Sequence, residues 1–107
     1  MNLTLLDKFL YRDMPQALMQ AYYSAGNSLS AITQAQVVAT GDVTAKTYTD
    51  GYTWSIENTS RKADEVTILI AVDSGAQATA LNSRIAETGN IKKKAVSESN
   101  LKITYQL

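Results

Sequence analysis

The sequence contains no histidine and no cysteine, and each absence removes a class of chemistry. Without histidine, no side chain has an unperturbed pKa near neutrality for general acid–base catalysis. Without cysteine, the chain has no thiolate nucleophile, no thiolate metal ligand and no disulfide. Packing alone must therefore stabilise the fold, and the composition favours a structural role over catalysis.

The chain also lacks an excess of charge and a long apolar run. Ten basic residues balance ten acidic ones, and the pI is about 6.2. A neutral chain has no general attraction to nucleic acid or anionic lipid, and little charge repulsion between its copies. No apolar run reaches the ~18–20 residues that span a bilayer, and we identify no signal peptide at the N-terminus. We therefore expect neither a nucleic-acid nor a membrane partner, and a location in a virion or the cytoplasm.

The 107 residues, 45% of them apolar, are typical of one globular domain spanning residues 1–107. Residues 2–11 place Leu3, Leu6 and Leu10 on one face of a short helix. Asp13 precedes Met14-Pro15-Gln16 as a good N-cap, so we expect a second helix to start there.

The second helix is expected to run to about residue 38, because apolar residues recur at spacings of three and four. Gly26-Asn27 interrupts this stripe and is expected to kink or split the helix. The stripe consists of Leu18, Tyr22, Ala25, Leu29 and Ile32.

A hairpin follows, because Asp50-Gly51 is a strong two-residue turn signal between strands at 43–49 and 52–58. This turn would pair Thr47 with Trp54 and Ala45 with Ile56, and it predicts that the Trp54 ring is buried against the long helix.

The strand expected at Glu65–Asp73 is apolar on both faces, which is typical of a central strand covered on both sides. Ser74 and Gln77 predict the start of a helix that reaches about Thr88, with Gly89 as its C′ residue. The last strands, at 91–96 and 101–107, flank a turn at Ser97-Glu98-Ser99-Asn100.

These elements give the order α-β-β-β-α-β-β. The sequence thus predicts an α+β fold in which helices pack on one mostly antiparallel sheet.

Few residues suggest a ligand site. Asp73-Ser74-Gly75, between a strand and a helix, either binds an anion or only caps the helix, and we favour capping. We interpret Lys92-Lys93-Lys94 as the guard of an edge strand rather than a phosphate contact. The pairs Asp7 with Asp13 and Asp64 with Glu65 are weak candidates for a divalent metal. We expect no metal, no cofactor and no catalytic residue, because no hydroxyl has a marked base.

A protein interface is more plausible than a small-molecule site. Exposed tyrosines are typical of interfaces, and the first helix offers an apolar stripe. The candidate interface residues are Leu3, Leu6, Leu10, Tyr23 and Tyr48.

Residues 65–107 resemble small tail-terminator and tail-completion proteins of tailed bacteriophages. The resemblance lies in the strand EVTILIAV, the helix AQATALNSRI and the terminal strand NLKITYQL. It implies a non-enzymatic ring subunit at the end of a tail tube, and it carries over no site residue.

We therefore expect a non-catalytic structural or assembly protein that acts as a homo-oligomer or with other structural proteins, with a phage tail or head–tail component as the concrete version. The alternative is a small soluble ligand-binding or regulatory module with a pocket between helix and sheet near Tyr52 and Trp54. A small acid–base enzyme ranks last.

Overall fold

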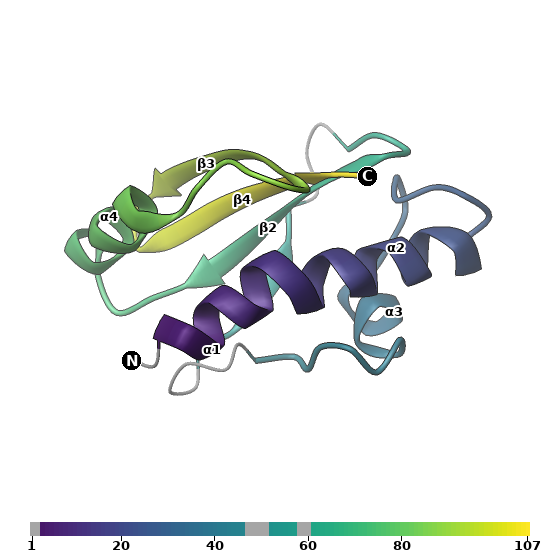
Figure 1. Ribbon diagram of the computed structural model, residues 1–107, viewed down its shortest axis with the longest axis horizontal. Coiled ribbons are helices and arrows are strands. Elements are labelled where there is room, and N and C mark those ends of the chain that lie inside the picture. Colours follow the sequence, from purple (N-terminus) through teal and green to yellow (C-terminus); the bar gives the residue numbers. More distant parts are fainter. Residues whose placement is uncertain (1–2, 47–51, 58–60) are drawn as a thin grey trace.

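The computed structural model describes residues 3–46, 52–57 and 61–107 (Figure 1). It confirms the expected α+β class, with helices on a four-stranded antiparallel sheet of order β1-β2-β4-β3. The helical elements are α1 (Leu3–Lys8), the π-helical segment η1 (Phe9–Asp13), α2 (Met14–Ser24), α3 (Gln34–Val38) and α4 (Gly75–Arg84). The strands are β1 (Trp54–Ile56), β2 (Glu65–Ala71), β3 (Ile91–Ser97) and β4 (Asn100–Gln106).

The first three helical segments form one uninterrupted helix along the sheet (Figure 1). The amide of Met14 donates to the carbonyl of Phe9, five residues back, so the helix widens by one residue at η1. The prediction that Asp13 is an N-cap is therefore wrong: its backbone is helical and its side chain makes no capping bond. Its carboxylate instead forms ion pairs with Lys8 and Arg12.

The wide turn creates a polar group that the helix cannot satisfy. In the five-residue spacing of η1, the carbonyl of Leu10 would accept from residue 15, but Pro15 has no N–H. The buried Tyr105 hydroxyl of β4 donates to this carbonyl across 2.6 Å. Burial, and secondly the charge of Tyr11, raises the pKa of Tyr105 well above its usual value. The hydroxyl therefore keeps its proton and remains a donor.

The expected split at Gly26-Asn27 is confirmed, and α3 ends at Val38 as expected, but residues 25–33 between the two helices are not helical. Gly26 and Asn27 have positive φ, 76° and 63°, and the helix ends just before them at Ser24. Leu29 and Ile32 still reach the core, but from a turn whose carbonyls both accept from the Arg61 guanidinium. The short α3 then begins at Thr33, whose hydroxyl accepts from the Gln36 amide and completes a capping box.

The sheet register separates two faces. Val66, Ile68 and Ile70 of β2 stand opposite Tyr105, Ile103 and Leu101 of β4, and all six side chains are buried beneath the long helix. The helix α4 packs on this same face. Lys94 stands opposite Ile103, and its amino group donates to the carbonyls of Asn82 in α4 and of Ile85 just after it.

The expectation that β2 is covered on both sides is therefore wrong. The strand is central, as expected, but none of the described helices lies on its second face. Thr67 and Leu69 on that face are only half-buried, and Ala71 is exposed.

The hairpin turn at Asp50-Gly51 lies outside the described residues, but the pairing near it differs from the prediction. Lys46 stands opposite Thr53, whereas the predicted turn would place it opposite Ser55. This isolated bridge replaces the predicted strand over residues 43–46. On its other edge the backbone of Trp54 pairs with Ile70 of β2, and Thr47, its predicted partner, lies outside the described residues.

Burial of Trp54 is confirmed, but the ring it packs on, Phe9, belongs to the segment that the sequence placed in the separate first helix. The Trp54 side chain is only 2% exposed, and its ring centroid lies 6.4 Å from that of Phe9. Its indole N–H donates to the Thr44 carbonyl at 2.6 Å. The indole thus connects η1, β1 and the loop before β1.

The start of α4 is as predicted, but its end is not. The Ser74 hydroxyl caps the helix by accepting from the Gln77 amide. The helix ends at Arg84 rather than near Thr88, so Gly89 is not its C′ residue. Two side chains from other elements bind the backbone groups at this end of the helix. Lys94 donates to the carbonyls of Asn82 and Ile85, and the Tyr11 hydroxyl accepts from the Ala86 amide.

Replacing Tyr105 with phenylalanine should lower the free energy of unfolding by about 1–3 kcal/mol, because the Leu10 carbonyl would remain buried without a donor. Urea unfolding followed by circular dichroism measures this change. Tyr23→Phe is the matched control, because the Tyr23 side chain is 65% exposed and its hydroxyl can reach water.

In a Pro15→Ala background, Tyr105→Phe should lower the free energy of unfolding by less than it does in the parent protein. The alanine at 15 supplies the backbone N–H that can donate to the Leu10 carbonyl. Equal costs in both backgrounds would contradict the proposed link between Pro15, Leu10 and Tyr105.

Replacing Trp54 with alanine should cost roughly 3–5 kcal/mol of stability, because it removes a large buried ring and leaves a cavity beside Phe9. The tryptophan emission of the parent protein should be blue-shifted, because the ring of Trp54 is buried. The signal can be assigned to Trp54 because the chain has no other tryptophan. Emission like that of free tryptophan in water would contradict the burial.

Candidate interaction surface

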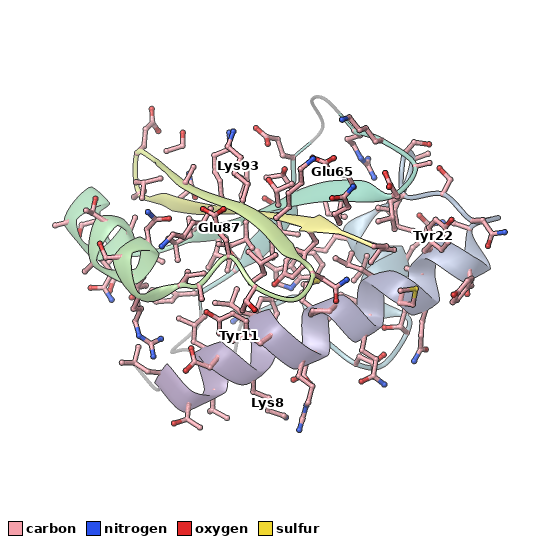
Figure 2. All side chains as sticks on the ribbon, turned by 45° about the horizontal axis from the view of Figure 1, so that its top comes forward. Lys8, Tyr11, Tyr22, Glu65, Glu87 and Lys93 are labelled. Atoms are coloured by element: carbon pink, nitrogen blue, oxygen red, sulfur yellow. The ribbon has the colours of Figure 1, made fainter. Side chains whose placement is uncertain are left out.

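No helix among residues 3–46, 52–57 and 61–107 covers the second face of the sheet, which we call the open sheet face. Because side chains alternate along strands, it carries the residues between the buried ones of each strand. Figure 2 shows Glu65 and Lys93 on the side of the sheet turned away from the long helix. The open sheet face comprises Ser55, Glu57, Glu65, Thr67, Leu69, Ala71, Lys92, Lys93, Ala95, Ser97, Asn100, Lys102, Thr104 and Gln106.

The open sheet face contains a hollow of about 430 Å³. Short side chains form its floor, and the hydroxyls of Thr67 and Thr104 hydrogen-bond to each other there at 2.8 Å across β2 and β4. Longer charged side chains surround this floor. The hollow is lined by Glu57, Glu65, Thr67, Lys92, Lys93, Ala95, Lys102 and Thr104.

The charges around the hollow do not cancel. Lys102 pairs with Glu57, and Lys92 pairs with Glu65, each at 3.1 Å. The fifth charged side chain is Lys93, which is exposed and forms no ion pair with any part of the chain that the structure describes. Three lysines thus face two glutamates, and the hollow carries one positive charge in excess.

A β-bulge explains how neighbouring lysines share this face. The register shifts between Ile91 and Lys93, which stand opposite Tyr105 and Thr104. The extra residue, Lys92, can then reach Glu65 on the open sheet face. Lys94 points to the helix side of the sheet, where it donates to the carbonyls of Asn82 and Ile85. β3 is an edge strand, as our interpretation of the lysine run required.

Our predicted interface residues do not form one surface. Leu6 and Leu10 are 1% and 0% exposed, so the expectation that they form an interface is wrong, because the sheet covers them. Leu3 is 41% exposed and Tyr23 is 65% exposed, but both belong to the long helix. Tyr48 lies outside the described residues.

Sequence reasoning therefore missed the open sheet face. The signal was the alternating set Thr67, Leu69 and Ala71, which we interpreted as a second buried face.

The N-terminus of α4 is satisfied by the chain itself. Ser74 caps it, and the carboxylate of Asp73 accepts from the Tyr52 hydroxyl at 2.7 Å. The weak metal candidates are also engaged elsewhere: Asp7 pairs with Arg84, and Glu65 pairs with Lys62 and Lys92. Within residues 3–46, 52–57 and 61–107, no three acidic side chains gather as metal ligands.

The position expected for a ligand pocket between helix and sheet is occupied by protein. The Trp54 ring packs on Phe9, and the Tyr52 hydroxyl is bound to Asp73. No helix among the described residues is long and apolar enough to cross a membrane.

Comparisons with protein-family models, with curated proteins and with solved structures give no match. Function is therefore inferred from the open sheet face itself.

Replacing Glu65 with glutamine should change the free energy of unfolding by less than about 1 kcal/mol, because ion pairs near the surface contribute little to stability. Chemical denaturation measures the change. A much larger loss would mean that the Glu65–Lys92 pair serves the fold rather than a partner.

Proposed function

We propose that the protein is a non-catalytic assembly subunit, acting as a homo-oligomer or within a larger complex, and that the open sheet face is its contact surface. The observation that supports this most is the one-sided arrangement of the helices. The long helix and α4 bury one face of the sheet, while the hollow on the other face has no described helix above it.

Antiparallel sheets can leave one face in water, so an open face alone does not indicate an interface. Two features favour a partner here. The middle of the face consists of short side chains with half-buried Leu69 and Ala95, while its long charged side chains surround the hollow. A centre of partly buried, less polar side chains with a polar rim around it is the usual arrangement in a protein interface.

The chemistry of the hollow favours binding over catalysis. Its two glutamates are neutralised by Lys92 and Lys102, and the Thr67 and Thr104 hydroxyls bond to each other. A hydroxyl nucleophile needs an adjacent base, and the chain has no histidine to provide one.

The concrete version of this proposal is a ring subunit of a tailed-phage virion. It rests on the resemblance of residues 65–107 to tail-terminator and tail-completion proteins, and it agrees with a contact surface on a sheet of the same segment.

Sedimentation velocity from low to high micromolar protein, at low salt, tests the proposal. We expect species larger than a monomer whose fraction rises with concentration. Ala95→Tyr should shift this equilibrium toward monomer by at least about tenfold, because a bulky side chain enters the hollow and prevents close packing.

Ala80→Tyr is the matched control, because Ala80 is exposed on α4 and lies away from the open sheet face. It should leave association unchanged. Association that survives Ala95→Tyr would exclude the open sheet face as the contact.

A further inference from the structure

We infer that the copies associate head to tail: the β3–β4 turn of one copy, carrying Glu98, docks into the hollow of the next copy beside Lys93. This inference rests on the proposed function and specifies the partner as a second copy of this chain. It follows from the opposite charges of Glu98 and Lys93 and from their separate positions on the β3–β4 hairpin.

The first observation is the position of the turn. Ser97 and Asn100 pair with each other, so Glu98 and Ser99 form a two-residue tip at one end of the sheet. Lys93 stands opposite Thr104, further along the same hairpin. Since a strand rises about 3.3 Å per residue, roughly 15 Å separates Lys93 from the tip. The tip and the hollow thus lie apart in one molecule.

The second observation is charge complementarity. Glu98 is exposed and forms no ion pair with a described residue, and the hollow has one positive charge in excess. Asp73 adds negative charge near the tip, because the neighbouring Val72 amide donates to the Ser99 carbonyl. One end of the hairpin is therefore acidic and the hollow is basic, so each copy presents both halves of a complementary contact.

The third observation is shape. The tip has the sequence Ser97-Glu98-Ser99-Asn100, so small polar residues surround one long carboxylate, and Gly75 at the start of α4 packs closely on the Glu98 carbonyl. The floor of the hollow is made of short side chains, with the paired hydroxyls of Thr67 and Thr104 at its centre. A small polar tip can enter such a hollow and bring its carboxylate to the Lys93 amino group.

A contact between two different surfaces is heterologous. It extends to a third copy and closes into a ring, or grows as a filament, according to the rotation per step. The expected assemblies are therefore not limited to dimers.

Two charge reversals test the contact. Lys93→Glu and Glu98→Lys should each weaken self-association at least about tenfold, because like charges would meet at every junction. Both side chains are exposed, and Glu98→Lys leaves a non-glycine residue at the positive φ of 57°, so the fold should be preserved. Sedimentation velocity measures association, and circular dichroism checks the fold.

An equimolar mixture of the two variants provides the decisive measurement. Each junction between unlike copies again joins opposite charges, so the mixture should assemble although each variant alone does not. Lys46→Glu and Glu87→Lys are the matched controls, because both residues are exposed and lie outside the hollow and the tip. The controls should associate like the parent protein, separately and mixed.

The outcomes separate this inference from the proposed function. If the parent assembles and neither reversal weakens it, or if the mixture is no better than its components, the head-to-tail contact is wrong while self-association stands. A parent protein that stays monomeric at every concentration overturns both the contact and the self-association.

Discussion

The fold depends on the packing of one long helix against one face of the sheet, and this packing converges on Tyr105. Its ring is completely buried between β4 and the helix, and its hydroxyl supplies the hydrogen bond that Pro15 denies to the Leu10 carbonyl. The π-helical turn, the proline and the tyrosine therefore act together. Loss of the Tyr105 hydroxyl would leave the buried Leu10 carbonyl without a donor, as long as residue 15 is a proline.

The same packing determines where a partner can bind. Trp54 covers one end of the helix-facing core, and Lys94 fixes α4 on that side by binding its last carbonyls. With the described helices gathered on one face, the sheet presents its other face outward, with short side chains and an unbalanced charge at Lys93. The asymmetry that stabilises the core therefore also creates the surface on which our functional proposal is based.

The sequence predicted helix ends correctly where the backbone conformation depends on one or two local residues. Gly26-Asn27 adopts positive φ and ends the long helix, and Ser74 caps α4. The N-cap signal at Asp13 failed because the backbone continued its helical hydrogen bonding through that residue. Asp13 looks like an N-cap, but the helix passes through it because Met14 bonds to Phe9. The apolar residues on both faces of β2 correctly predicted a central strand.

The sequence by itself determined the class of fold, the burial of Trp54, and the shared face of Val66, Ile68 and Ile70. These features follow from the spacing of apolar residues along the chain and from the size of the tryptophan ring, which are local properties. Only the tertiary structure decided which face receives the helices. Leu69 is apolar, yet it is half-buried on the open side, because the chain places its helices on the face of Tyr105. Whether an apolar residue becomes core or contact surface depends on elements far away in the sequence, so alternation alone cannot determine it.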